Sequence, residues 1–315
     1  MKIATVRGIE IKLHYSTLLI VGLVGFSVGQ FYFSITGGTA PLFELILMGI
    51  LGGIILLGSI ITHELAHSFV AQKQGLGIHE IEMYIFGGMS KIEDEPHTPS
   101  KEAKMAVVGP LSSLAIGGIL ILLLFIPIPY GIFISTLFSY IGLANVILGV
   151  FNLLPAFPMD GGRMIRAFLW KRRNDKVSAT ETSVKISEGL GLLMIVGGFA
   201  EIFFFSLFGG IWLIMIGMFL RNSANAALRE TRMREKLSHV RLDDLMNEFM
   251  VKIPENLQID EARKNYFMKY KRDCFAVESA SDSQIKGIVC VKDVKNAPVK
   301  SDGKIIKDVM RTPKD

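Results

Sequence analysis

Three long stretches without Lys or Arg constrain this chain most, at residues 13 to 72, 105 to 162 and 186 to 220. A helix crosses a hydrocarbon layer of ~30 Å with about 20 residues, so each stretch can span a membrane and the first two can span it twice. Hydrophobic residues make up 50% of the 315, and the mean hydropathy is +0.43. A single soluble core does not require this much apolar sequence. We therefore predict a membrane protein.

Segments rich in Gly and Pro divide the apolar stretches into spans. The turn signals are "FSITGGTAPLF" at 33 to 43, "IPIPYG" at 126 to 131 and "FSLFGG" at 205 to 210. They predict an all-α polytopic membrane protein of about six transmembrane helices. These are expected near residues 16 to 35, 43 to 72, 105 to 126, 132 to 154, 185 to 205 and 208 to 220.

Basic side chains fall on alternate connections between the predicted spans. They are Lys2, Arg7, Lys12, Lys73, Lys91, Lys101, Lys104, Arg163, Arg166, Lys171, Arg172 and Arg173. By the positive-inside rule the N terminus and the segments 73 to 104 and 155 to 184 are cytosolic, in a multi-pass protein of the cell membrane. Charge facing the cytoplasmic leaflet explains a pI near 9.1 without a nucleic-acid partner.

The composition changes after Arg221. We expect a transmembrane domain at 1 to 220, a charged helical linker at 221 to 240 and a cytosolic α+β module at 241 to 315. Within the module, "LDDLMNEFM" at 242 to 250 and "IKDVMRTP" at 306 to 313 share an Asp-[Leu/Val]-Met pattern, which suggests a repeat whose second copy has only begun. Cys274 and Cys290 lie in this module, so reduced thiols are expected there.

The second predicted span carries a chemical motif, "HELAH" at 63 to 67. On a helix, His63 and His67 lie four residues apart on one face and can bind one ion, with Glu64 beside it. Zinc needs three protein ligands and an open position for water, whose proton the glutamate takes during attack on a carbonyl. Ionisable groups inside a membrane are costly and are kept mainly when paired, solvated or functional. We therefore predict a metal site.

The third ligand is less certain from the residues alone. The remaining histidines lie at or outside the ends of the spans: His14, His79, His97 and His239. A better candidate is Asp160 in "FNLLPAFPMDGGR" at 151 to 163, where a span ends on the cytosolic side. The alternative is an Asp-Gly-Gly turn in which this carboxylate only caps the next helix.

Taken together, "HELAH" and "NLLPAFPMDGGR" resemble the site-2 protease family of intramembrane zinc metalloproteases over residues 1 to about 220. The stretches "MYIFGGMS" at 83 to 90, "VVGPLSS" at 107 to 113 and "NVILGVFNLLP" at 145 to 155 match as well. The resemblance implies one Zn²⁺ on His63, His67 and Asp160, with Glu64 as general base and acid. It also implies that Asn152 donates to the developing oxyanion. From the residues alone, Asn152 can equally be an interhelical hydrogen-bonding residue.

The segment 78 to 96 alternates apolar and polar residues around Gly87 and Gly88, which predicts a β-hairpin at the membrane interface. In the site-2 protease family a sheet of this kind is thought to border the active site. Its edge strand can pair with an unwound substrate segment by strand addition. A hairpin that serves packing alone is the alternative.

The module resembles a cystathionine-β-synthase (CBS) domain, with an amphipathic helix at 259 to 271 and strands at 273 to 278 and 285 to 291. Such domains usually work in pairs that bind adenine nucleotides, so the resemblance implies nucleotide binding or self-association. In "GIVCVKDV", Asp293 matches the nucleotide-binding pattern, whereas Cys290 stands where Ser or Thr is usual. A regulatory or dimerising domain without a ligand is the alternative.

The sequence thus predicts an intramembrane zinc metalloprotease that hydrolyses peptide bonds within or near transmembrane segments of other membrane proteins in the lipid bilayer. The first alternative is a transporter or channel in which the intramembrane His and Glu line an ion path. The second is an inactive scaffold that only binds the metal. A transporter or channel does not explain why Asp160 and Asn152 follow the His motif on the same side of the membrane, and the presence of Glu64 argues against an inactive scaffold.

Overall fold

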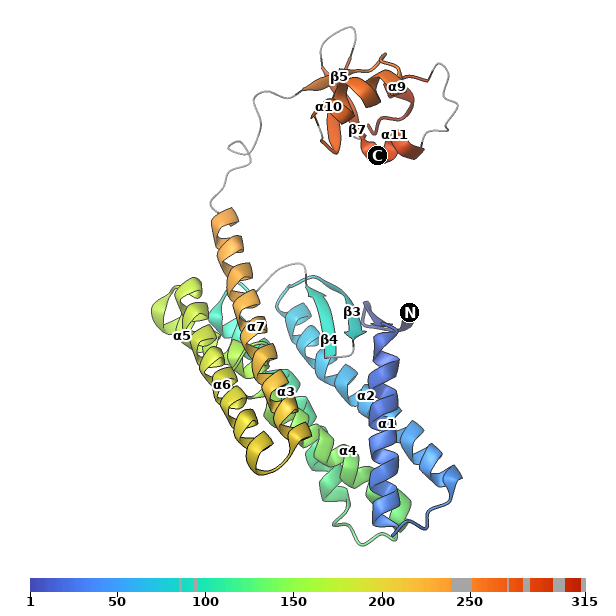
Figure 1. Ribbon diagram of the computed structural model, residues 1–315, viewed down its shortest axis with the longest axis vertical. Coiled ribbons are helices and arrows are strands. Elements are labelled where there is room, and N and C mark those ends of the chain that lie inside the picture. The colour runs from blue at the N-terminus through green and yellow to red at the C-terminus, as the bar shows by residue number, and fades with distance from the viewer. Residues whose placement is uncertain are drawn as a thin grey trace. The chain divides into compact units, whose positions relative to one another are not determined.

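The computed structural model describes residues 1–84, 87–92, 96–238, 251–270, 272–279, 284–296 and 304–312. The chain divides into two compact units, Met1–Ser238 and His239–Asp315. Each unit is described by itself, and Figure 1 gives the labels of their helices and strands.

The first unit is a bundle of long helices (Figure 1). Six of its described helices are long and apolar enough to cross a membrane. They are α1 (Ser16–Ile35), α2 (Leu42–Lys73), α3 (Pro99–Leu123), α4 (Gly131–Asn152), α6 (Lys176–Phe204) and α7 (Leu207–Ser238). A shorter amphipathic helix, α5 (Asp160–Arg173), lies between α4 and α6. The prediction of a mostly helical protein with six spans is confirmed.

Several helices extend beyond the predicted spans. α3 and α6 begin at Pro99 and Lys176 rather than near 105 and 185, and α7 continues without a break to Ser238. The bilayer limits the apolar part of a helix, but backbone hydrogen bonding continues into charged residues once they reach water. The expected boundary at residue 220 therefore lies inside α7, and the first unit runs to Ser238.

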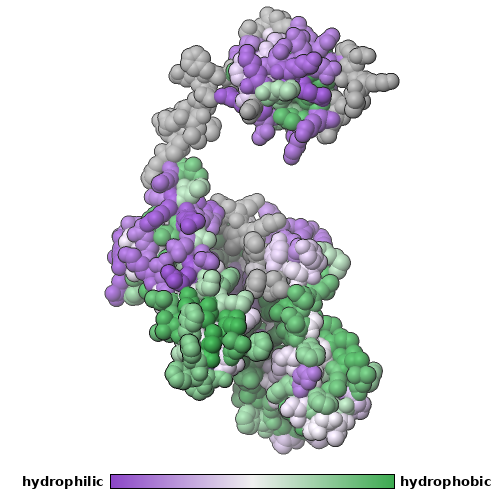
Figure 2. Space-filling model, in the orientation of Figure 1, coloured by the Kyte–Doolittle hydropathy of each residue, from purple (hydrophilic) through white to green (hydrophobic). Residues whose placement is uncertain are grey.

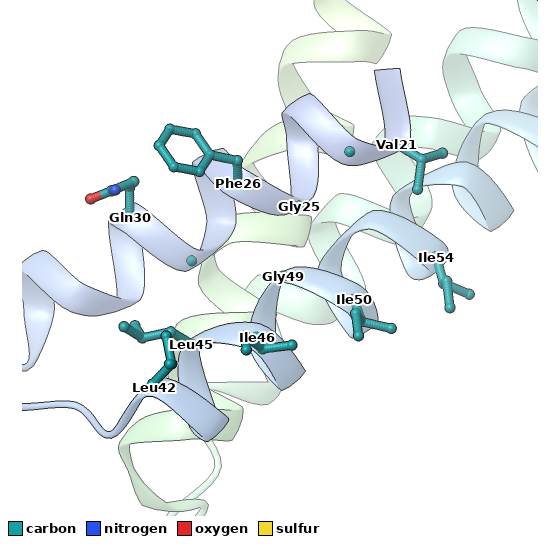
Figure 3. A pocket seen from close by; sticks show the side chains of 12 residues that line it. Val21, Gly25, Phe26, Gln30, Leu42, Leu45, Ile46, Gly49, Ile50 and Ile54 are labelled. Carbon is teal, nitrogen blue, oxygen red and sulfur yellow. The ribbon is translucent and has the colours of Figure 1, made fainter. Parts of the chain in front are cut away.

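Glycines allow neighbouring helices to approach backbone to backbone. A Cβ on Gly25 of α1 would lie 2.7 Å from the carbonyl oxygen of Gly49 of α2, and the reverse distance is the same. Figure 3 shows these two helices and the apolar groove of about 580 Å³ beside them. The acyl chains of lipid are as apolar as the side chains, so no hydrophobic force drives helices together in the bilayer. Helices associate there through close packing of this kind instead.

Glycines also allow close backbone packing between α6 and α7. A Cβ on Gly198 of α6 would lie 2.7 Å from the carbonyl oxygen of Gly210 of α7, and one on Gly191 would lie 2.7 Å from that of Gly217. Large apolar side chains on the outer faces remain exposed, among them Phe203 and Trp212. This pattern is typical of helices that pack through small residues and present bulky ones to lipid.

A four-stranded sheet lies at one end of the bundle, in the strand order β1-β2-β3-β4. The hairpin β3 (Ile78–Tyr84) and β4 (Gly87–Ile92) confirms the predicted one. The strands β1 (Lys2–Val6) and β2 (Ile9–Leu13) were not predicted, although Arg7 and Gly8, both at positive φ, form a typical hairpin turn between them. The sheet packs on the ends of α2 and α3 through a shared apolar core that includes Ile81 and Met105.

The surface of the first unit is divided by polarity. Figure 2 shows hydrophobic residues over most of the helical bundle and hydrophilic residues around α5 and the adjoining end of α7. α5 ends in Lys171, Arg172 and Arg173. Charge at one end and apolar side chains along the helices are what a bundle inserted in a bilayer requires.

The second unit contains a three-stranded sheet of β5 (Lys252–Pro254), β6 (Cys274–Glu278) and β7 (Ile285–Cys290). A helical segment runs through α9 (Ile259–Ala262), a π-helical turn (Arg263–Phe267) and α10 (Met268–Tyr270), where the amphipathic helix was predicted. The first copy of the suggested repeat, at 242 to 250, lies outside the described residues. The second unit has its own apolar core, which includes Phe275 and Val289.

The expectation of reduced thiols is wrong for this structure, because Cys274 and Cys290 form a disulfide. The physical reason is the strand register. β6 and β7 are antiparallel, and Cys274 pairs directly with Cys290. A sequence does not reveal that two cysteines sixteen residues apart face each other across a hairpin.

We expect a chain that ends at residue 238 to keep the stability of the bundle and one that ends at residue 223 to lose part of it. The shorter chain lacks the buried Ala224 and the 2.9 Å hydrogen bond from Asn225 to Glu188 of α6. A loss of about 2 kcal/mol would lower the melting temperature by about 4–8 °C in a chain of this size. Thermal unfolding in detergent measures this, and equal melting temperatures would contradict the prediction.

Candidate metal centre

Three side chains from two helices meet inside the bundle. His63 and His67 lie one turn apart on α2, and Asp160 is the first residue of α5. All three are buried, and each offers a ligand atom within 4.8 Å of the others. This is the only group of three or more His, Cys, Asp or Glu side chains able to hold a metal in the part of the chain that the structure describes.

The distances among these atoms fit a tetrahedral zinc site. Nε2 of His67 lies 3.2 Å from Nε2 of His63 and 3.1 Å from Oδ2 of Asp160, and the remaining distance, from His63 Nε2 to Asp160 Oδ2, is 3.3 Å. Two zinc bonds of about 2.0–2.1 Å at the tetrahedral angle separate their ligand atoms by about 3.3 Å. The three atoms thus form one face of such a tetrahedron.

The outer nitrogens of the two imidazoles fix their orientation. Nδ1 of His67 lies 2.7 Å from the carbonyl oxygen of Met105, and Nδ1 of His63 lies 2.9 Å from Oγ of Ser113. A carbonyl only accepts, so we assign the proton of His67 to Nδ1. Its Nε2 then presents a lone pair to the other ligand atoms, as a metal ligand must. Both partners belong to α3, which packs behind the two histidines.

The arrangement of the cluster suits a bound cation. With its proton on Nδ1, His67 faces both the carboxylate oxygen of Asp160 and Nε2 of His63 with a lone pair. Electron-rich atoms at 3.1 to 3.3 Å repel one another strongly in an interior of low dielectric constant. A single bound cation converts all three contacts into attraction, so the residues present fit a zinc ion.

Gly109 of α3 has no side chain, and this makes room for the cluster. A Cβ at this position would lie 2.7 Å from Nε2 of His63 and still closer to Nε2 of His67. Any side chain here would therefore collide with the ligand atoms. Gly109 and Ser113 both belong to "VVGPLSS", a stretch whose role the sequence alone does not reveal beyond its family resemblance.

Glu64 lies on α2 beside the cluster, under strand β4. A Cβ on Gly88 of β4 would lie 2.5 Å from Cγ of Glu64 and 2.8 Å from its Cδ. The strand can pass this close only because Gly88 has no side chain. The predicted hairpin therefore borders the carboxylate that the motif marks as catalytic.

The loop before α5 sets the position of Asp160. A Cβ on Gly161 would contact the carbonyl oxygens of Leu153 and Leu154, and one on Gly162 would lie 2.6 Å from the backbone nitrogen of Phe157. The two glycines therefore let the loop fold back onto the start of the helix. Met159, not Asp160, is the N-cap residue, and no side chain caps the helix there. The capping alternative for Asp160 thus does not describe this structure.

The structure does not place Asn152 in the ligand cluster. It is the last residue of α4, and its side-chain amide donates to the carbonyl oxygen of Leu148 on the same helix at 2.9 Å. His14 lies with Ser16 and Tyr84 near the sheet, at 2.9 Å from the Ser16 hydroxyl. His239 lies outside the described residues.

The groove between α1 and α2 lies away from this chemistry (Figure 3). Of the twelve residues that line it, all are apolar except Gln30. It has no group that could hold a metal or move a proton. The candidate functional site is therefore the buried cluster and not this apolar groove.

Comparison with known proteins agrees with the geometry. The model of peptidase family M50 matches residues 52–133 and 129–196. Rip3 of Mycobacterium tuberculosis, a zinc metalloprotease by name, is 30% identical over 295 residues, which cover 92% of this chain and 74% of that one. The chain belongs to peptidase family M50. Two further relatives bear the name of zinc metalloprotease: sll0528 of Synechocystis, 29% identical over 95% of this chain and 78% of its own, and MJ0392 of Methanocaldococcus jannaschii, 29% identical over 86% and 73%.

Among solved structures, the site-2 protease of Methanocaldococcus jannaschii is similar, with 29% identity and a TM-score of 0.48 over 72% of this chain and 94% of that one. Membership of family M50, the relatives named as zinc metalloproteases and the six helices able to span a membrane identify the M50 chain as an intramembrane zinc metalloprotease with zinc as its cofactor. The predicted protease function is confirmed, in preference to a transporter or channel.

We predict that Gly109→Ala prevents the M50 chain from holding zinc, because the new methyl group occupies space beside both Nε2 atoms. Zinc affinity should fall by at least about 10-fold, as it does when the surroundings of metal ligands are disturbed. Gly118→Ala on the same helix is the matched control, since a Cβ there meets nothing within 4 Å. Zinc content after dialysis measures both. Normal zinc in Gly109→Ala would show that the ligands can shift to make room.

Proposed function

We propose that His63, His67 and Asp160 hold the zinc ion and that Glu64 is the general base in hydrolysis of peptide bonds. The observation that carries this proposal is the meeting of three ligand atoms at 3.1 to 3.3 Å beside Glu64, inside a helix long and apolar enough to span a membrane. When bound, zinc supplies a Lewis acid that polarises water and the scissile carbonyl.

In this proposal the residues of the chain divide the remaining work. Glu64 takes a proton from the attacking water and later returns it to the leaving amine. Asn152 donates a hydrogen bond to the oxyanion. Its position at the C-terminal end of α4, directly before the loop to Asp160, supports this role. To act so, its amide must exchange the bond to Leu148 for one to the substrate.

We infer that the substrates are transmembrane segments of other membrane proteins. His63 lies ten residues before Lys73, which corresponds to ~15 Å of helix from the charged end of α2. A substrate bond at this depth belongs to a segment embedded in the bilayer. β4 supports a binding mode, because it is an edge strand whose Gly88 lies against Glu64. An unwound segment that pairs with β4 would pass beside the general base.

We further propose that the N terminus and the second unit are cytosolic. The basic end of α5, the charged last turns of α7 and Lys73 of α2 support this orientation through the positive-inside rule. The expected division into a membrane domain, a linker at 221 to 240 and a module at 241 to 315 is kept as a proposal. Its linker coincides largely with the end of α7.

The second unit is proposed to be a CBS-type module that regulates the protease or associates with another copy. Its three-stranded sheet and adjoining helix support the resemblance. Asp293, the acid that matched nucleotide-binding members, accepts from Arg311 at 2.7 Å, and this guanidinium lowers the pKa of the carboxyl. Asp293 also accepts from the backbone N–H of Cys290. These bonds favour self-association over nucleotide binding by this unit alone.

We predict that Glu64→Gln keeps zinc and loses activity, because the amide cannot take a proton while the three ligands are intact. General bases contribute about 10²–10⁴ to rate, so cleavage should fall by at least 100-fold. The assay uses purified protein, single-span substrates and a zinc chelator as a second arm. Glu201→Gln, in the membrane helix α6, is the control that should leave the rate unchanged. A variant at residue 64 that cleaves at the normal rate would remove Glu64 from the mechanism.

We predict that trypsin added to sealed inverted membrane vesicles removes the second unit and leaves the membrane-spanning helices protected, since the exposed side is the cytosolic one. The many Lys and Arg residues beyond Arg221 provide cleavage sites. Right-side-out vesicles are the control and should protect the unit. The reverse result would invert the topology.

In the same inverted vesicles, a rate change caused by adenine nucleotide before digestion and absent after it would assign nucleotide regulation to this unit.

A further inference from the structure

A second pair of charged side chains lies inside the bundle, between α3 and α5. Glu102 is 1% exposed and Arg166 is 8% exposed. Nε of Arg166 donates to Oε1 of Glu102 at 2.7 Å, and Nη2 donates to the same oxygen. From its place in the sequence, Arg166 is expected to belong to the charge that faces the cytoplasmic leaflet. In the structure Arg166 is buried instead, so it has a role other than facing the membrane surface.

A contribution to the stability of the fold does not by itself explain why this ion pair is buried. Oε2 of Glu102 is buried without a hydrogen-bond partner among the residues that the structure describes. Two charges removed from water regain their hydration energy only through excellent geometry and full hydrogen bonding, and apolar side chains of similar volume often serve as well or better. Unlike apolar side chains, the ion pair fixes the relative orientation of the groups that it joins, because its hydrogen bonds require a specific geometry.

On α5, the pair is linked to the position of Asp160. Arg166 follows Asp160 by six residues, which is ~9 Å along the helix. Its guanidinium also lies over the ring of Phe157, at 5.2 Å from the centroid, in the loop just before Asp160. The backbone N–H of Phe157 donates to Oγ of Ser187 on α6 at 2.9 Å. Arg166 therefore contacts both the helix that begins with Asp160 and the loop that leads to it.

On α3, the pair is linked to the position of His67. Glu102 lies one turn before Met105, whose carbonyl oxygen accepts from Nδ1 of His67. The same turn of α3 thus orients one candidate ligand directly and the other through Arg166. A rigid turn that binds His67 directly and is linked to Asp160 through Arg166 can keep the separation of the two candidate ligands constant.

We propose that Glu102 and Arg166 are positioning residues that fix the third zinc ligand, Asp160, relative to His63 and His67. This inference rests on the proposed role of Asp160 as a ligand. Neither member of the pair contacts the cluster in the described structure; they act on it through α5 and the loop that contains Phe157. Loss of the pair should loosen the site without removing a ligand.

The decisive variant replaces both charges, Glu102→Met together with Arg166→Met. It leaves no unpaired buried charge, so the protein should fold with a melting temperature close to that of the original chain. Its zinc dissociation constant should nevertheless rise by about 10-fold or more, the usual effect of disturbing groups that orient metal ligands. In the cobalt-loaded protein, the visible absorption bands of the tetrahedral ion should shift or broaden. Turnover should fall through kcat with KM unchanged.

Tyr32→Phe is the control for a purely structural loss. Tyr32 is 1% exposed and donates to Glu44 at 2.6 Å, in the contact between α1 and α2. This variant should lower the melting temperature while zinc affinity and the cobalt bands stay the same. The single variant Arg166→Lys should retain the charge but weaken zinc binding, because an ammonium cannot reproduce the planar guanidinium contacts with Glu102 and Phe157.

Normal zinc affinity, cobalt bands and kcat in the double Met variant would overturn the proposal and leave the pair a structural one. Asp160→Ala separates this failure from failure of the proposed function. If Asp160→Ala binds zinc as tightly as the original chain, Asp160 is not a ligand and the assignment on which the inference rests is wrong. If Asp160→Ala loses zinc and the double Met variant does not, only the positioning role is wrong.

Discussion

The structure of the bundle depends on one electrostatic constraint, the crowding of two imidazole nitrogens and a carboxylate oxygen at 3.1 to 3.3 Å in a buried site. In water such groups would be solvated and pushed apart. Inside a helical bundle they are held together by the backbone, and a bound cation would make all three contacts favourable. On the proposed assignment of the ligands, zinc would therefore stabilise the chain, and the helices around the cluster keep its three atoms together.

The helix that most clearly serves this purpose is α3, although it supplies no ligand. Met105 and Ser113 accept or share the outer imidazole protons, Gly109 leaves room for the ligand atoms, and Glu102 anchors α5 through Arg166. These four contacts lie on one face of a helix that also packs against α2 and α5. The candidate metal centre thus lies among three helices: α2 and α5 carry the proposed ligands, and α3 contacts both histidines and, through Arg166, α5.

Glycine has two roles in this protein, and both come from the absence of a side chain. In the membrane part it brings helices close, as at Gly25 with Gly49 and at Gly198 with Gly210. Near the site it brings backbone close to functional groups, as at Gly88 over Glu64 and Gly109 beside the two histidines. The first role favours association of helices in lipid. The second lets backbone approach the candidate catalytic and ligand side chains closely.

The sequence by itself determined the six spans, the His-Glu-x-x-His motif and the loop with Asp160, because long apolar stretches and rare ionisable residues within them have few explanations. It could not determine the partners of those residues. In the sequence Arg166 resembles a surface charge, but in the structure it is buried with Glu102. The strands β1 and β2 are too short for their pattern to be recognised in the sequence. Cys274 faces Cys290 only because of the register of a hairpin. The surroundings of Asp160 also needed the structure, since only the packing of α5 against α3 and α6 brings its carboxylate to the histidines. Local patterns depend on neighbouring residues, whereas these contacts join segments far apart in the chain, and the tertiary structure alone brings them together.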